Sequence, residues 1–482
     1  MLPVVRNVQA LLGPLTGSLL AFLLFWLLYS SPASDPVLAA PAAHFWIVSL
    51  TSLGAAALAV VVGAAGARAR DSRIVYLAAG FASMAGLFAL HGLSTPGMIL
   101  GPNSVTPLAS QLALIAFAAS MVAAAYLRPV EARGPLLRLL VGWVGSIVAL
   151  DVVLMLAPDL ARFVPVHLDP LQNGVAVLVV FMLALAGVRF LEGYRLSRSS
   201  IHLVMLHVVG WVMVSQVIMT LGQTFRVSWW LYHLLLLLAV VLMLATFARQ
   251  MRSGQLSRGL NALLDDDAGR RLAYGLRPEV RALVVATEAK DTYTAGHMQR
   301  VADLAVRIGR AMSLPPEELR VLAQAGVVHD VGKIEVPDAV LNKQATLEPS
   351  ERELINQHPA NGERIGRTLG LHRLELEVIR HHHERWDGTG YPDGLAGESI
   401  PLLARIMAVA DVYDAVTSAR AYRPAWSRED ARALILRESG GGFDPRVAKV
   451  ALTVLADVSD RERVDSNVRF TLAGAGAAGT AP

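Results

Sequence analysis

Long apolar runs follow one another through the first half of the chain. Each is about 20 residues long, the length that an α-helix needs to cross the hydrocarbon core of a bilayer. The runs span residues 8–29, 44–66, 75–94, 107–127, 136–156, 173–192, 202–222 and 229–249. A cleavable signal peptide is the alternative for the first run, but its unbroken apolar stretch and the similar runs after it favour an anchored helix. Residues 1–250 are therefore predicted to form a polytopic membrane bundle of about eight helices.

The pattern changes after residue 250. Residues 251–277 are polar and predict a cytoplasmic linker. From Pro278 the apolar positions recur at helical spacing, as in Val280, Leu283 and Val284, and no alternating run predicts a strand. Residues 278–455 are thus predicted to form an all-helical domain, and residues 456–482, which end in GAGAAGTAP, a disordered tail. The predicted fold class is all-α throughout.

Composition and charge agree with this division. The 482 residues are 54% hydrophobic and 17% charged, whereas a soluble domain carries about 25% charged residues. Arginines alternate between the connecting segments, with eleven on one side of the predicted membrane and two (Arg162 and Arg226) on the other. Because cytoplasmic loops carry the excess of basic residues, both termini and the second half are predicted to lie in the cytoplasm, at the inner (plasma) membrane. The net charge of +4 does not indicate nucleic-acid binding.

The membrane half contains ionisable residues whose purpose the sequence leaves open. His44, His91, His167 and His233 all fall near the outer surface in the predicted topology. They are candidates for a metal or ligand sensor. The alternative, which is the commoner case for single histidines near interfaces, is that they are hydrogen-bonded structural residues.

The second half carries histidines and carboxylates in a pattern typical of a metal site. His329–Asp330 ends an apolar segment, His358 follows, then the run His381–His383, and Asp411 closes another apolar run. The chain has no cysteine, which excludes thiolate sites, and imidazole with carboxylate suits iron, manganese or related divalent ions. Any single histidine could be a satisfied core residue, but bare polar groups are costly on apolar helices, so this reading is poor for the whole set.

Three strings in this half, HDVGK, HHERWDGTGYP and VADVYDAVTSARAYR, resemble the HD-GYP subfamily of HD-domain phosphohydrolases. The resemblance extends from Asp291 to Asp444–Pro445 and keeps the order and approximate spacing of the family motifs. It implies an all-helical, HD-type, metal-dependent bundle. It also implies a phosphodiesterase that hydrolyses cyclic di-GMP to pGpG or GMP, regulated here by the membrane half.

The resemblance assigns residues to a centre of two divalent metal ions, with iron or manganese favoured. The matching ligands are His297, His329, Asp330, His358, His382, His383 and Asp411, and Asp330 is expected to bridge both ions. Some members hold a third ion through a glutamate four residues before the first histidine. Tyr293 occupies that position here, so two ions are expected. His381 is extra to the family pair and is expected to be a neighbour of the ligands.

The resemblance also implies contacts with substrate. Lys333, Arg420 and Arg423 match positions that bind phosphate, and Lys333 joins Asp330 as a catalytic candidate. Gly390, Tyr391 and Pro392 belong to a glycine- and proline-rich loop over the site, and Asp414 is expected to support the metal ligands from one helical turn after Asp411. The expected partners are cyclic di-GMP and membrane lipid. Diguanylate cyclase domains and a second copy of the chain are further candidates.

Two other functions remain open at the level of sequence. One is a catalytically silent module that binds the nucleotide and reports it to a partner, although such a module would be expected to lose a metal ligand. The other is an HD phosphohydrolase that acts on another cyclic dinucleotide or on a nucleoside triphosphate. The GTGYP loop argues against the triphosphate, and no feature of the sequence separates the cyclic dinucleotides.

Overall fold

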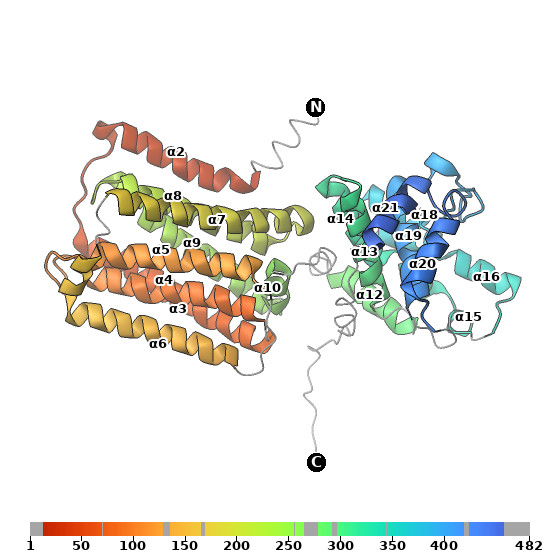
Figure 1. Ribbon diagram of the computed structural model, residues 1–482, viewed down its shortest axis with the longest axis horizontal. Helices are drawn as coiled ribbons and strands as arrows, with labels where there is room; N and C mark the ends of the chain where they lie inside the picture. Colours follow the sequence, from red (N-terminus) through yellow and green to blue (C-terminus); the bar gives the residue numbers. More distant parts are fainter. Residues whose placement is uncertain are drawn as a thin grey trace, which may run out of the picture. The chain divides into compact units, whose positions relative to one another are not determined.

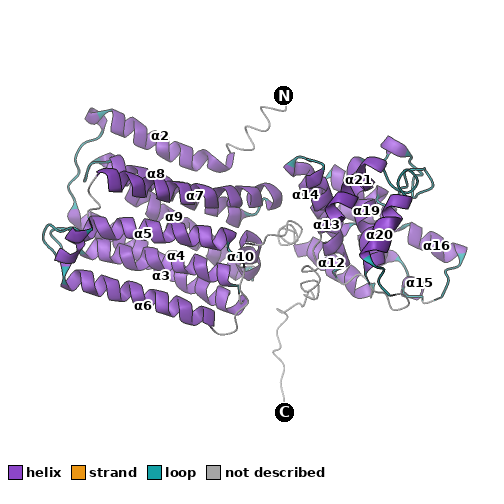
Figure 2. Cartoon of the chain, in the orientation of Figure 1, coloured by secondary structure: helices purple, strands orange, loops and turns teal. Residues whose placement is uncertain are grey.

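A computed structural model describes residues 13–69, 71–128, 135–164, 169–254, 256–264, 278–291, 296–343, 345–418 and 424–456. These residues form helices joined by loops and contain no β-strand (Figure 2). The chain divides into two compact units, Met1–Leu264 and Asp265–Pro482, which are described separately below (Figure 1). The all-α prediction is confirmed within the described residues.

The first unit is a bundle of long apolar helices with short 3-10 turns between some of them. Among the described residues, eight helical stretches are long and apolar enough to cross a membrane, which agrees with the predicted number. The elements are η1 (Gly13–Leu15), α2 (Thr16–Ser30), η2 (Pro32–Ser34), α3 (Pro41–Ala69), α4 (Ser72–Leu93), α5 (Val105–Tyr126), α6 (Pro135–Leu156), η3 (Pro158–Phe163), α7 (Asp169–Ser197), α8 (Ser200–Leu221), α9 (Val227–Arg252) and α10 (Leu256–Leu264).

Burial in this unit separates inner helices from outer ones. Helix α4 is mostly buried and packs against α3, α5 and α6 (Figure 1). The outer helices α2, α6 and α7 expose large apolar side chains, among them Trp26, Val141 and Phe181. Apolar surface of this extent on a monomer marks contact with an apolar partner or a lipid phase.

Loops at one end of the bundle are tied together. The amide of Leu38 donates to the carbonyl of Phe225 at 2.6 Å, and the Asp35 carboxylate accepts hydrogen bonds from the Ser228 amide and hydroxyl, each at 2.7 Å. These contacts place the segment before α3 beside the start of α9. At the other end, Arg73 donates to the carbonyl of Leu264 in α10, a helix inside the predicted linker range.

The second unit is a bundle of shorter helices. Its elements are α12 (Pro278–Lys290), α13 (His297–Ala311), α14 (Pro316–Val328), η4 (Val331–Glu335), α15 (Asp338–Leu341), α16 (Pro349–Asn356), α17 (His358–Thr368), α18 (Arg373–His381), η5 (Gly397–Ser399), α19 (Leu402–Thr417), α20 (Arg428–Arg437) and α21 (Pro445–Ala456). Residues 265–277 and 457–482, which cover the C-terminal part of the predicted linker and nearly all of the predicted tail, lie outside the described residues.

Local sequence explains several of these helix boundaries. Helix α14 begins with Pro316 followed by two glutamates, which suit the positive end of the helix dipole. A capping box between Glu348 and Glu351 starts α16, and Ser427 caps α20 by accepting from the Asp430 amide at 3.0 Å. The buried residues of α12, α13, α14 and α18 then form one apolar cluster: Val280, Val284, Met298, Ala302, Val327, Val328 and Ile379.

One glycine sets how closely α17 approaches η4. A Cβ on Gly332 would lie 1.9 Å from the carbonyl oxygen of His358 and 2.5 Å from the amide nitrogen of Gly362. Both contacts are with backbone atoms, which cannot rotate away. Only a residue without a side chain therefore allows the first turn of α17 to reach this position.

We predict that Gly332→Ala destabilises the second unit, because α17 must move away from η4. Overpacking of this kind costs about 1–3 kcal/mol in unfolding free energy. Gly309→Ala is the matched comparison, since its Cβ would meet only leucine side-chain ends, those of Leu322 and Leu319 at 2.8 and 2.9 Å. Calorimetric unfolding of both variants should show the larger loss for Gly332→Ala. An equal or smaller loss would contradict the packing argument.

Candidate metal centre

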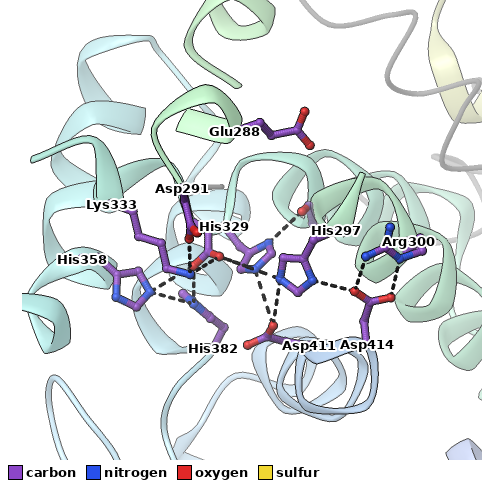
Figure 3. Close-up of polar contacts among 12 residues, drawn as sticks. Glu288, Asp291, His297, Arg300, His329, Lys333, His358, His382, Asp411 and Asp414 are labelled. Carbon is purple, nitrogen blue, oxygen red and sulfur yellow. Dashed lines mark hydrogen bonds and ion pairs between the residues drawn. The ribbon is translucent and has the colours of Figure 1, made fainter. Parts of the chain in front are cut away.

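Helix ends deliver most of the histidines to one place in the second unit. His297 opens α13 and His358 opens α17, while His329–Asp330 directly follows α14 and His382–His383 directly follows α18. Asp411 comes from the middle of α19, whose residues 403–411 are all buried. Five of the seven predicted ligands are labelled in Figure 3, where their side chains converge.

Two overlapping groups of ligand atoms share Asp330. One group contains His297 and His329, the other contains His358, His382 and His383, and within each group all ligand atoms lie within 4.8 Å of one another. The Oδ1 atom of Asp330 lies 3.2 Å from Nε2 of His358, and its Oδ2 atom lies 3.5 Å from Nε2 of His329. Asp330 therefore stands between the two groups.

Asp411 closes the first group from the opposite helix. Its Oδ1 atom lies 3.2 Å from Nε2 of His297 and 3.9 Å from Nε2 of His329. Together with His329 and His382 it also forms a third set of ligand atoms within 4.8 Å of one another. The structure thus brings together all seven residues that the sequence nominates as ligands.

Backbone hydrogen bonds fix which ring nitrogen of three histidines faces the site. In His329, His358 and His382 the Nδ1 atom lies 2.7–2.8 Å from the carbonyl oxygen three residues earlier. A carbonyl only accepts, so each Nδ1 carries the proton and each Nε2 keeps a lone pair. Those lone pairs all point toward the Asp330 and Asp411 carboxylates.

This arrangement fits a cation. Lone pairs of neutral imidazoles face carboxylate oxygens, and the Nε2 atom of His329 is buried with no hydrogen-bond partner among the described residues. Such groups repel each other and are costly when buried, unless a positive ion lies between them. The donor set of imidazole and carboxylate suits divalent iron, manganese or related ions.

The pKa values follow from burial and from the mixture of charges. Burial lowers the pKa of His329, and burial together with the neighbouring His383 lowers that of His382 well below the ordinary value. Burial and His358 lower the pKa of His383 to about 3. These rings are neutral at pH 7, the form that binds metal.

His297 differs, because two carboxylates face it. Burial lowers its pKa, but hydrogen bonds to Asp411 and Asp414 outweigh this and raise the value to about 10. Burial alone would raise the pKa of Asp411, yet the nearby imidazoles, His297 first among them, lower it. Binding of a cation at this position would displace the proton of His297.

Asp414 holds His297 in place. Its Oδ2 atom accepts from Nδ1 of His297 at 2.7 Å, and the guanidinium of Arg300 contacts both carboxylate oxygens at 2.7 and 2.9 Å (Figure 3). A carboxylate behind a ligating histidine fixes the ring and makes it a stronger ligand. Arg300 is a residue that the sequence reasoning missed, although it lies one helical turn after His297 and therefore on the same helix face.

Lys333 lies beside the shared carboxylate. Its Nζ atom is 2.6 Å from Oδ2 of Asp330 and 3.7 Å from Oδ2 of Asp291. Burial lowers the pKa of Lys333, but the two carboxylates outweigh it and raise the net value. The ammonium group therefore remains charged, and it lies next to the Asp330 carboxylate that both groups of ligand atoms share.

The GTGYP loop lies against the second group of histidines. The ring of Tyr391 stacks on His383 with 4.9 Å between ring centroids, and its amide donates to the carbonyl of His383 at 3.3 Å. A Cβ on Gly390 would lie 2.3 Å from the amide nitrogen of Arg385, so this position also requires glycine. Pro392 follows directly in the same loop.

Buried Glu384 anchors this loop and was not singled out from the sequence. Its two carboxylate oxygens accept from the amides of Asp393 at 2.7 Å and Leu395 at 3.1 Å. Its position directly after the histidine run is the signal that could have indicated a structural role. His381 contacts the same loop from outside the cluster of ligand candidates, since its Nε2 atom lies 3.0 Å from Oδ2 of Asp393.

Four residues singled out from the sequence fall outside the described part of the chain. They are Tyr293, which occupies the position of the additional glutamate, the phosphate-binding candidates Arg420 and Arg423, and the sensor candidate His167.

Comparison with known proteins gives a consistent result for this unit. Residues 284–447 match the HD domain family. The chain is 43% identical over 171 residues to a cyclic di-GMP phosphodiesterase of Pseudomonas aeruginosa, covering 35% of this chain and 41% of that protein. It is 39% identical over 178 residues to the cyclic di-GMP phosphodiesterase response regulator RpfG of Xanthomonas campestris, covering 36% and 47%.

A third relative carries a different substrate in its name. The chain is 36% identical over 172 residues to the 3'3'-cGAMP-specific phosphodiesterase 2 of Vibrio cholerae, covering 35% of this chain and 33% of that protein. The chain thus spans less than half the length of these relatives. Residues 284–447, which match the HD domain family, contain the histidines, carboxylates and GTGYP loop described above.

Proposed function

We propose that this chain is a membrane-anchored, metal-dependent phosphodiesterase that hydrolyses cyclic di-GMP to pGpG or GMP under the control of its membrane half. The observation that carries the proposal is the pair of donor groups that share Asp330. Two relatives with the same HD segment are named cyclic di-GMP phosphodiesterases, which supports this substrate. A complete donor set argues against the silent binding module.

Two divalent ions would supply activation of a water nucleophile and neutralisation of phosphate charge. His297, His329, Asp330 and Asp411 would hold one ion. Asp330, His358, His382 and His383 would hold the other, so Asp330 would belong to both ligand sets. Asp414 orients His297 through the 2.7 Å hydrogen bond, and the carbonyls behind the other rings orient them in the same way.

Lys333 and the loop then bind the substrate. We infer that Lys333, whose charged Nζ lies 2.6 Å from Oδ2 of Asp330, would contact a substrate phosphate at this centre. Gly390, Tyr391 and Pro392 line the approach to His383 and are proposed to contact the nucleotide. Arg420 and Arg423 are proposed to grip phosphate oxygens in bidentate fashion, in agreement with the resemblance to the family.

The second candidate function is hydrolysis of another cyclic dinucleotide. The similarity to a 3'3'-cGAMP-specific phosphodiesterase favours it over a triphosphate substrate. Both reactions break a phosphodiester bond at the same kind of centre, so the difference lies in recognition of the bases. We propose cyclic di-GMP as the preferred substrate.

We also propose that the first unit spans the inner membrane with both termini in the cytoplasm. The alternation of arginines and the eight apolar helices support this topology. The hydrogen bonds between the segment before α3 and the start of α9 support it too, because they bring two predicted outer loops to the same end of the bundle. Membrane lipid would cover the exposed apolar faces of α2, α6 and α7. Diguanylate cyclase domains and a second copy of the chain are further proposed partners.

We predict that the full chain, purified in detergent and loaded with manganese or iron, hydrolyses cyclic di-GMP faster than 3'3'-cGAMP and cyclic di-AMP. Products separated by chromatography at equal substrate concentrations give the three kcat/KM values. A preference for 3'3'-cGAMP would contradict cyclic di-GMP as the substrate and support the second candidate function, hydrolysis of another cyclic dinucleotide. Hydrolysis of none of the three would refute the enzymatic proposal.

We predict that Asp330→Asn loses at least one metal ion per chain and at least 100-fold in kcat/KM. A neutral amide cannot replace the shared carboxylate, and losing one buried charged partner costs about 3–5 kcal/mol. Asp338→Asn is the matched control, since it removes an exposed carboxylate of the same unit that pairs only with Lys290 at 3.3 Å. Elemental analysis and kinetics on both variants test the assignment, which fails if Asp330→Asn keeps its metals and turnover.

We predict that alkaline phosphatase fused after Arg252 is inactive in cells, whereas its fusion after Arg162 is active. The enzyme needs disulfides, which form outside the cytoplasm and not inside it. Immunoblots confirm equal expression of the two fusions. Activity only after Arg252 would reverse the proposed orientation.

A further inference from the structure

A second cluster of histidines lies in the first unit, far in sequence from the HD domain. His44 is near the start of α3, His91 is near the end of α4, and His233 is in the second turn of α9. Each offers a ring nitrogen, and these nitrogens all lie within 4.8 Å of one another. The three side chains are 2–3% exposed. Three helices thus bring one imidazole each to a single buried point.

Two of the rings are held with their Nε2 atoms toward each other. The Nδ1 atom of His91 lies 2.7 Å from the carbonyl oxygen of Thr106, so it must carry the proton and leave Nε2 with a lone pair. On His44, Nδ1 lies 3.0 Å from the Thr95 hydroxyl. The two Nε2 atoms are 3.1 Å apart. A polar neighbour behind each ring is the usual support of a metal-ligating histidine.

Hydrogen bonds do not account for the burial of the third ring, that of His233. A hydrogen bond between the Nε2 atoms of His44 and His91 would satisfy those two rings, but it would not involve His233. Neither ring nitrogen of His233 makes a hydrogen bond of normal geometry among the described residues, and the backbone contact with Trp229 in its own helix can engage only one of the two. Leaving a buried polar group unpaired costs about 1–3 kcal/mol. An ion bound by all three rings would engage the other nitrogen of His233 together with the facing lone pairs.

The geometry and the donor type narrow the class of ion. Zinc–nitrogen bonds are about 2.0–2.1 Å long, so two imidazoles on one tetrahedral ion have nitrogens roughly 3.3 Å apart. The 3.1 Å separation of the His44 and His91 nitrogens is close to this value. Three imidazoles without a carboxylate or thiolate suit zinc, copper(II) or nickel(II) and disfavour magnesium or calcium.

Aromatic side chains surround the cluster and hold it away from water. The ring of His233 lies 4.3 Å from that of Trp229 and 3.7 Å from that of Tyr232, measured between centroids, and Trp229 also lies 5.3 Å from His44. The ties between Asp35 and Ser228 fix the start of α9 against the segment before α3. The helices that carry His44 and His233 are therefore positioned before any ion binds.

We propose that His44, His91 and His233 form a binding site for one divalent transition-metal ion, with zinc, copper(II) or nickel(II) as the chemical class. Three protein ligands leave a fourth position open, as in catalytic and exchangeable zinc sites. All three residues lie toward the end of the bundle that carries the Asp35 and Phe225 loops. In the proposed topology this end faces away from the cytoplasm, so the ion would enter from outside the cell membrane.

The test measures zinc bound to the full chain in detergent. The HD centre is first disabled by combining Asp330→Asn with His329→Gln. The chain is then equilibrated with buffered zinc, freed of excess ion, and assayed by elemental analysis. We expect one zinc ion per chain to remain, and adding His233→Gln should remove at least nine-tenths of it.

The matched control is His207→Gln in the same background. His207 is a half-buried histidine of α8 whose Nδ1 atom lies 2.8 Å from the carbonyl oxygen of Leu203 in its own helix, and it does not belong to the cluster. The His207→Gln variant should retain the zinc ion. Size-exclusion chromatography and circular dichroism report whether each variant is folded.

Two outcomes would overturn the proposal. The first is that the chain with the disabled HD centre, in which His44, His91 and His233 are intact, binds no zinc. This outcome is informative even if the His233→Gln variant fails to fold. The second is that His233→Gln, shown to be folded, keeps its zinc. Because the assay measures bound metal and no hydrolysis, its failure is separate from any failure of the phosphodiesterase proposal.

Discussion

The second unit is organised around one electrostatic constraint, the need to compensate two buried carboxylates among five imidazoles. Asp330 and Asp411 are ionised in a site from which water is largely excluded, and buried charges of this kind are costly unless cations accompany them. Within the described residues Lys333 and protonated His297 supply part of that compensation. Divalent ions would supply it fully, which links the stability of this arrangement to its chemistry.

The position of each ligand follows from where helices start and stop. All five candidate histidine ligands lie at or directly beside helix ends, and in three of them a backbone carbonyl there accepts from Nδ1 and so fixes the ring. Gly332 lets the first turn of α17, and with it His358, come within reach of Asp330. Small residues at crossings and free carbonyls at helix ends together produce a rigid cluster from short helices.

The first unit shows the same physical rule in an apolar setting. Its core consists of leucine, valine, alanine and phenylalanine, and polar groups are admitted where partners exist, as for Asp35 with Ser228. Other polar atoms of this unit, such as Nε1 of Trp211, are buried without a partner among the described residues, and so is at least one ring nitrogen of His233. His233 is set apart because two further imidazoles, those of His44 and His91, face it.

The sequence by itself determined the helical fold class, the number of long apolar helices and the identity of the HD segment. Apolar runs and motifs are local patterns, and local patterns are what a linear sequence displays. It also nominated all seven metal-ligand candidates of the second unit, because the HDVGK and HHERWDGTGYP strings keep them at recognisable spacing.

Only the tertiary structure decided which of these residues meet. The sequence placed four histidines near the predicted outer surface, but only helix packing brings His44, His91 and His233 to one point, since nothing local relates positions 47 and 142 residues apart. In the same way, the contacts of Arg300 with Asp414 and of Glu384 with the GTGYP loop depend on which helix faces cross. Packing geometry is a property of the whole chain, so these partners become visible only after it has folded.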